Sequence, residues 1–154
     1  MSLYLLALLI GVIAGLRAMT APAAVSWAAH LGLLPLQHTP LAFLGATITP
    51  YILTVLALIE LVTDQLPKTP SRKVPMQFGA RLVTGALSGA AIGAAAGSMI
   101  AGAVAGLIGA VIGTFGGASA RGALARAFGR DLPAALVEDA VAVVGAVLIV
   151  MAIG

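Results

Sequence analysis

Cysteine is absent from this chain of 154 residues, and charged residues are scarce. Without thiols the chain has no disulfide bonds, no thiolate metal ligands and no cysteine nucleophile. Charged residues make up 8% of the sequence, whereas a soluble domain carries roughly a quarter. Hydrophobic residues make up 61%. Because so few polar groups cannot cover a globular surface, we expect most of the surface to face lipid.

Sequence signals of catalysis, metal binding and nucleic-acid binding are also missing. The formal net charge is only +3, which is too small for a nucleic-acid-binding surface. The two histidines, His30 and His38, have no cysteine or acidic residue close to them in the sequence, and a metal site needs more ligands. No phosphate-binding or serine-nucleophile motif occurs. We therefore expect no nucleic acid, metal or cofactor, and the sequence favours a protein that is not an enzyme.

Long apolar runs are what the sequence has instead. A helix needs about 20 apolar residues to cross a bilayer. The polar breaks divide the chain into six runs, which we interpret as the spans of a single integral membrane domain, residues 1–154. The runs are 3–16, 18–36, 41–63, 78–97, 100–117 and 132–153. The predicted fold is therefore all-α, a polytopic transmembrane helical bundle.

Two of these assignments have alternatives. The N-terminal residues MSLY lack Lys and Arg, so we expect the first run to be a membrane span rather than a cleaved signal peptide. The second run is short and is interrupted by Pro22. A re-entrant or interfacial segment at 18–36 would reduce the number of crossings to five.

The distribution of basic residues favours six crossings. Lys and Arg collect in cytoplasmic loops. With the N-terminus outside, six crossings place all eight basic residues on the inner side. They are Arg17, Lys68, Arg72, Lys73, Arg81, Arg121, Arg126 and Arg130. The outer connections, around QHTP and SMIA, carry no charge. The sequence thus predicts a multi-pass protein whose charged loops are cytoplasmic.

Two short motifs echo each other along the chain. GLRAMTA at 15–21 and GARLVTG at 79–85 share Gly-x-Arg-x-x-Thr followed by a small residue. DQLP and RDLP follow them at similar distances, which indicates an internal repeat of about 65 residues, as in many transporters. Chance similarity in so biased a composition is the alternative. In a duplication, Arg17 with Thr20 and Arg81 with Thr84 are equivalent pairs, each on one helix face.

Acidic residues inside the apolar runs are the strongest sign of a site. Glu60 and Asp64 are four residues apart, so they share a helix face. Glu138 and Asp139 lie about 10 Å inside the last run at a rise of ~1.5 Å per residue. Since adjacent residues on a helix point about 100° apart, we expect only one of them to face the bundle centre. A carboxylate at that depth costs roughly 3 kcal/mol or more unless it is paired, solvated or protonated.

Two interpretations of these charges remain open. In the first, the acidic residues form ion pairs with Arg17, Arg81 and Arg121 that only fix the helix register. In the second, they line a hydrated vestibule, open to the cytoplasm, that binds an ion, a proton or a charged headgroup. The candidate residues for an ion or solute are Arg17, Thr20, Glu60, Asp64, Arg81, Thr84, Glu138 and Asp139. The candidates for a lipid headgroup are Lys68, Arg72, Lys73, Arg121 and Arg126.

Glycines recur at small-xxx-small spacing in the fourth and fifth runs, the pattern of a glycine zipper. This spacing lets helix backbones approach closely in lipid. The residues singled out for packing are Gly85, Gly89, Gly93, Gly97, Gly109 and Gly113. We expect these helices to form the packed centre, either against each other or against a second copy in a homo-oligomer.

Five segments together resemble a known family. In chain order they are GLRAMTAPAAVSWAA, ELVTDQLPKTPSR, RLVTGALSGAA, FGGASARGALARAFG and PAALVEDAVAVVGA. They resemble the small bacterial integral membrane proteins grouped as domain-of-unknown-function family 4126. The similarity extends over nearly the whole chain, and ELVTDQLPKTPSR is its most distinctive part. The resemblance implies a compact multi-span helical protein of the bacterial cytoplasmic membrane, and it brings no activity or catalytic residues.

The sequence leaves three hypotheses about function. The first is a transporter or channel-like protein with a polar ion- or solute-binding site in the cytoplasmic third of the bilayer. The second is a protein that binds or modifies lipid headgroups, with membrane lipids as its partners. The third is a structural partner subunit, in which the buried charges serve stability alone.

Overall fold

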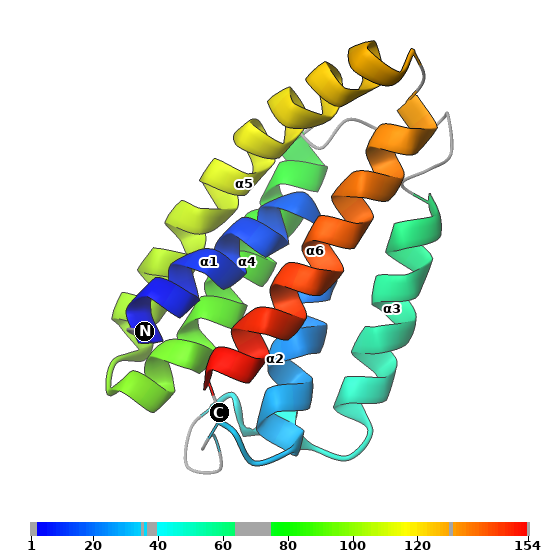
Figure 1. The fold of residues 1–154 in the computed structure, drawn as a ribbon. Coiled ribbons are helices and arrows are strands. Elements are labelled where there is room, and N and C mark those ends of the chain that lie inside the picture. Colours follow the sequence, from blue (N-terminus) through cyan, green and yellow to red (C-terminus); the bar gives the residue numbers. More distant parts are fainter. Residues whose placement is uncertain (1–2, 35, 37–39, 64–74, 130, 154) are drawn as a thin grey trace.

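The computed structural model describes residues 3–34, 36, 40–63, 75–129 and 131–153 (Figure 1). Within these ranges the chain forms six α-helices and one 3₁₀ turn, η1, with no β-strand, which confirms the all-α fold. The elements are α1 (Leu3–Leu16), α2 (Thr20–His30), η1 (Ala42–Gly45), α3 (Thr49–Thr63), α4 (Pro75–Ala96), α5 (Met99–Phe128) and α6 (Asp131–Ile153).

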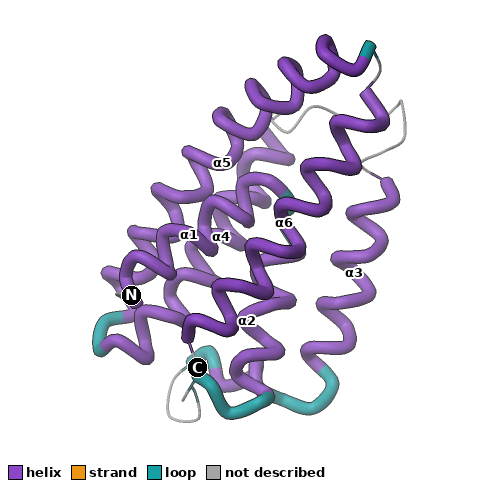
Figure 2. The backbone as a smooth tube through the Cα atoms, in the orientation of Figure 1, coloured by secondary structure: helices purple, strands orange, loops and turns teal. Residues whose placement is uncertain are grey.

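The helices alternate in direction. The C-terminal ends of α1, α3 and α5 and the N-terminal ends of α2, α4 and α6 lie toward one end of the bundle, at the top of Figure 1. We call this the charged end. Every charged side chain that the structure describes lies either in the half of its helix that is nearer to this end or in the turn between α1 and α2. They are Arg17, Glu60, Arg81, Arg121, Arg126, Glu138 and Asp139. The described loops that join α2 to α3 and α4 to α5 lie at the opposite end (Figure 2).

Three helices are long and apolar enough to cross a membrane. The segments are Phe78–Ala96, Met99–Phe128 and Leu136–Ile153, while the apolar stretches Leu3–Leu16 and Thr49–Glu60 are shorter. Large apolar side chains are exposed along the bundle, with Ile100 79% and Met151 68% exposed. A helical bundle with such a surface is embedded in a membrane.

Several helix ends differ from the predicted runs. The second run, 18–36, contains only the short α2, because the chain leaves the helix at Leu31 and takes a positive φ of 86° at Gly32. In the third run, 41–63, η1 precedes α3, which begins at Thr49. The fifth helix continues well beyond residue 117 to Phe128, because ARGALARAF, although it carries two arginines, is rich in good helix formers. Gly129, with φ 73°, ends it.

Glycines bring α1, α4 and α5 into backbone contact within one chain. A Cβ built at Gly89 would lie 2.3 Å from the carbonyl oxygen of Gly102, and Gly85 and Gly93 approach α5 in the same way. A Cβ at Gly109 would lie 2.1 Å from the carbonyl oxygen of Leu8 in α1. Gly113 likewise contacts α1 at Val12. Only glycine fits where backbones are this close.

Gly97 has a different position from the one expected. It has φ 104°, and a Cβ built on it would meet nothing within 4 Å. Gly97 therefore does not pack helices; it allows the sharp turn between α4 and α5. The next residue, Ser98, begins α5, since its side chain accepts a hydrogen bond from the backbone N–H of Ala101 at 3.2 Å.

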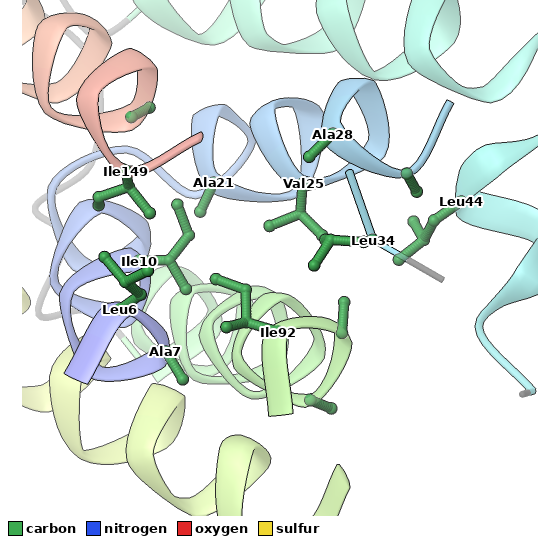
Figure 3. Packing of buried hydrophobic residues seen from close by; sticks show 14 of the residues in the cluster. Leu6, Ala7, Ile10, Ala21, Val25, Ala28, Leu34, Leu44, Ile92 and Ile149 are labelled. Atoms are coloured by element: carbon green, nitrogen blue, oxygen red, sulfur yellow. The ribbon is translucent and has the colours of Figure 1, made fainter. Parts of the chain in front are cut away.

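An apolar core fills the space between α1, α2 and α4. Ile10, Val25 and Ile92 come from these three helices and point toward one another (Figure 3). Ile149 of α6 closes this cluster next to α1. The core holds α1 and α2 at a fixed angle, and so it fixes the turn that joins them at the charged end.

Candidate functional site

The junction of α1 and α2 is an interruption of helical structure inside the bundle. α1 ends at Leu16, α2 begins at Thr20, and Arg17 lies between them. The two helices have 14 and 11 residues. At ~1.5 Å per residue their lengths are about 21 and about 17 Å, against ~30 Å of hydrocarbon. If their other ends reach the opposite interface, the junction lies within the hydrocarbon layer.

Arg17 is fully buried at this junction, with 0% of its surface exposed. Its Nη1 donates to the carbonyl oxygen of Leu16 at 2.9 Å and to the carboxylate of Glu138. Its Nε donates to Oδ1 of Asp139 at 2.6 Å, and its Nη2 is 2.5 Å from the same oxygen. Glu138 and Asp139 of α6 therefore both contact one guanidinium. Our expectation that only one of them faces the bundle centre is wrong, because the planar guanidinium is wide enough to reach both.

Arg81 of α4 approaches the same turn from the other side. It is 2% exposed, and its Nη1 donates to the carbonyl oxygen of Gly15 at 2.9 Å. The last carbonyls of a helix lack partners within the helix and carry partial negative charge, so a cation is favourable there. Arg17 and Arg81, the two arginines of the echoed motifs, thus converge on the last turn of α1.

The predicted Arg–Thr pairs do not have equivalent positions. Arg81 and Thr84 both lie in α4, and Thr84 Oγ1 donates to the carbonyl oxygen of Arg81 at 3.3 Å. Arg17, however, lies in the turn before α2, so Arg17 and Thr20 do not share a helix face. The Thr84 hydroxyl contacts its own helix, and only Thr20 adjoins the junction.

Glu60 of α3 stabilises the beginning of α2. Its Oε2 accepts a hydrogen bond from the backbone N–H of Ala18 at 2.9 Å, and its Oε1 accepts one from Met19 at 2.8 Å. The first N–H groups of a helix lack partners within the helix and carry partial positive charge, so a carboxylate is favourable there. At the junction, the C-terminal end of α1 with its partial negative charge therefore contacts arginines. The N-terminal end of α2 with its partial positive charge contacts a carboxylate.

A third arginine lies near the cluster. Nη1 of Arg121 in α5 is 3.9 Å from Oε1 of Glu138, and Arg121 is 19% exposed. Among the described residues, the junction therefore brings together three arginines and three carboxylates, which balance when all are ionised. We call these six side chains the junction cluster. They are Arg17, Glu60, Arg81, Arg121, Glu138 and Asp139.

Several predicted residues lie elsewhere. Asp64, Lys68, Arg72 and Lys73 are outside the described residues. Arg126 is exposed in the last turn of α5. Within the described ranges, no three His, Asp or Glu side chains are grouped so that they could hold a metal ion.

The structure adds Thr114, which the sequence did not single out. Thr114 is fully buried in α5, and its backbone nitrogen is 2.5 Å from a Cβ built at Gly15. Its hydroxyl and that of Thr20 find no hydrogen-bond partner within the described residues. A threonine in the middle of a Gly-rich apolar run is the only signal that could have indicated it.

Fold and site together define a membrane-embedded helical bundle with a buried, ion-paired helix junction. Comparison of the chain with protein-family models, with curated proteins and with solved structures finds no match. Function therefore has to be argued from the junction itself.

Proposed function

We propose that this protein is a small transporter or channel-like protein, with its ion- or solute-binding site at the junction of α1 and α2. The observation that supports this most is the complete burial of Arg17 between two helix ends, with Glu138 and Asp139 of α6 on its guanidinium. Transporters commonly bind their substrates and ions at interrupted helices, where the helix ends provide partial charges and unpaired backbone groups.

The chemistry of the junction supports binding over a purely structural role. Replacing a buried ion-paired cluster by apolar residues is often neutral or stabilising, so stability alone does not require such a cluster. A buried hydroxyl without a partner costs about 1–3 kcal/mol. Two such hydroxyls, from Thr20 and Thr114, adjoin the junction, and a polar solute could bond to them.

We further propose that the chain crosses the bacterial cytoplasmic membrane six times, with the charged end on the cytoplasmic side. The clustering of all described charges toward one end supports this topology. The echoed motifs carry the proposal of an internal duplication, whose copies would have diverged, because Arg17 lies in a turn whereas Arg81 lies within α4.

Flux through proteoliposomes tests the proposal. Purified protein would be reconstituted, and H⁺, Na⁺, K⁺, Cl⁻ and acetate would each be given a gradient across the membrane. We expect wild-type protein to move at least one of them faster than empty liposomes do. Glu138→Gln, which removes a charge from the junction cluster, should abolish that flux. Arg126→Ala, an exposed position on the same end of the bundle, should retain it.

Two results would contradict the proposal. One is a folded wild-type protein that moves none of the five ions. The other is a flux that Glu138→Gln leaves unchanged, because the permeation path would then bypass the junction. If the wild type shows no flux and Glu138→Gln lowers the stability of the protein, the results would instead favour the third hypothesis, a structural partner subunit.

A lipid-headgroup site is the alternative function. It is supported by the exposed Arg126 and the partly exposed Arg121, both near the C-terminal end of α5. Native mass spectrometry of protein extracted with its lipids would test it. A retained anionic lipid that is lost in Arg126→Ala would favour this alternative, and no retained lipid would exclude it.

A further inference from the structure

The beginning of α2 holds a carboxylate in this structure. The two oxygens of Glu60 accept hydrogen bonds from two successive backbone amides, those of Ala18 and Met19, at 2.9 and 2.8 Å. One carboxylate bridging two successive amides at a helix start is a common way in which proteins recognise small anions. The geometry depends on the backbone of residues 18 and 19 and not on the rest of the Glu60 side chain.

A further donor follows directly in the chain. Thr20 is the first residue of α2 and is 8% exposed, and its hydroxyl has no hydrogen-bond partner in the part of the chain that the structure describes. Two amides and a hydroxyl thus occur on three consecutive residues. Glu60 uses the two amides, and the hydroxyl is a donor beyond what Glu60 uses.

The helix that supplies Glu60 is the least embedded in the bundle. α3 packs against α2 and η1, whereas α1, α4 and α5 pack tightly against one another. Among the described side chains of α3, only Pro50 and Ala57 are buried. Near the middle of α3, the indole N–H of Trp27 donates to Thr54 Oγ1 at 2.7 Å and holds that part of the helix against α2. Glu60 therefore attaches the end of α3 that lies at the junction.

We propose that the amides of Ala18 and Met19, with the Thr20 hydroxyl, form a binding site for a small organic anion that carries a carboxylate. Glu60 occupies this site while α3 is docked, and the carboxylate of the solute replaces it when the end of α3 moves away. Without Glu60 the junction cluster has three arginines and two carboxylates, so a singly charged anion restores the balance and a cation does not. The inference rests on the proposed transport function and names its substrate class.

Distance measurement between spin labels tests this exchange. The natural chain has no cysteine, so labels at Val62→Cys in α3 and Val83→Cys in α4, both well exposed, need no other change. Labelled protein in nanodiscs would be compared in acetate and in chloride at equal pH and ionic strength. We expect acetate to increase the population with a long distance. Glu60→Gln should lower the ratio of docked to undocked α3 roughly tenfold in chloride, because it removes a charged hydrogen-bond acceptor.

Thr20→Val is the matched variant for the site. It keeps the size of the side chain and removes only the hydroxyl, so α3 should stay docked in chloride and the response to acetate should weaken. Identical distance distributions of the wild type in acetate and chloride would overturn the proposal and leave Glu60 as a helix cap only. A flux of inorganic ions that is lost in Glu138→Gln, together with no response to acetate, would remove this site and leave the transport function standing.

Discussion

Arg17 contacts more of the site than any other described side chain. Its guanidinium joins the last turn of α1 to Glu138 and Asp139 of α6, while Arg81 and Glu60 bind the backbone on either side of it. A buried cation of this kind is stable only while its acidic partners are present, and the reverse holds for the acids.

Arg17→Ala should therefore lower the free energy of unfolding by about 3–5 kcal/mol, because Glu138 and Asp139 would lose their common partner in a buried place. Arg126→Ala, at an exposed position, should change it by less than about 0.5 kcal/mol. Denaturation of detergent-solubilised protein, followed by far-ultraviolet circular dichroism, measures both. Equal stability of the two variants would show that the junction cluster does not hold α1 and α6 together.

At the scale of single residues, the sequence indicated candidates for a site but not all of their contacts. Arg17, Glu60, Glu138 and Asp139 could be singled out because charges are so rare within apolar runs. The partners of Glu60 and Arg81 could not be predicted, because both bind backbone groups that only the packing of the helices brings near them. Thr114 escaped notice because one hydroxyl barely changes the hydropathy of a run.

At the scale of helices, backbone contact between α1, α4 and α5 supports the whole bundle. The small-xxx-small spacing was enough to indicate close packing, but it could not distinguish glycines that pack from those that turn. Gly97 has the spacing of the stripe and yet ends α4. Hydropathy indicates where an apolar run ends, but a helix can continue beyond that point. The continuation of α5 from residue 117 to Phe128 was therefore not predicted.

Two glycine substitutions in α5 separate packing from helix propensity. A Cβ at Gly106 would lie 2.1 Å from the carbonyl oxygen of Gly85, so Gly106→Ala should separate α4 from α5 and destabilise the protein by more than about 2 kcal/mol. A Cβ at Gly116 meets nothing within 4 Å, so Gly116→Ala should stabilise α5 by up to about 1 kcal/mol. Thermal unfolding in the same detergent measures both, and a harmless Gly106→Ala would refute the close contact.

At the scale of the whole molecule, the described charges form one polar end on an otherwise apolar bundle. The apolar runs were sufficient to predict the all-α, membrane-embedded fold. The number of crossings was not determined by them, because α1, α2 and α3 are shorter than a standard span and their depth depends on how the bundle sits in the bilayer.

The proposed topology predicts which end of the molecule meets each aqueous phase. Ala127→Cys lies near the end of α5 at the charged end, and Thr47→Cys lies in an exposed loop at the opposite end. A maleimide that cannot cross membranes should label Thr47→Cys in spheroplasts and should label Ala127→Cys only after lysis. Labelling in the reverse order would place the charged end outside.

Aqueous access to the junction is the most direct test of the account. Thr20→Cys places a thiol of similar size beside Arg17, and Ala28→Cys places one at a fully buried apolar position on the same helix. In open membrane vesicles, a small hydrophilic thiol reagent should modify Thr20→Cys roughly tenfold faster or more, because opening of the junction costs less than opening of the core. Equal, negligible reactivity of the two positions would mean that no water-filled path reaches the junction, and the binding site proposed there would be contradicted.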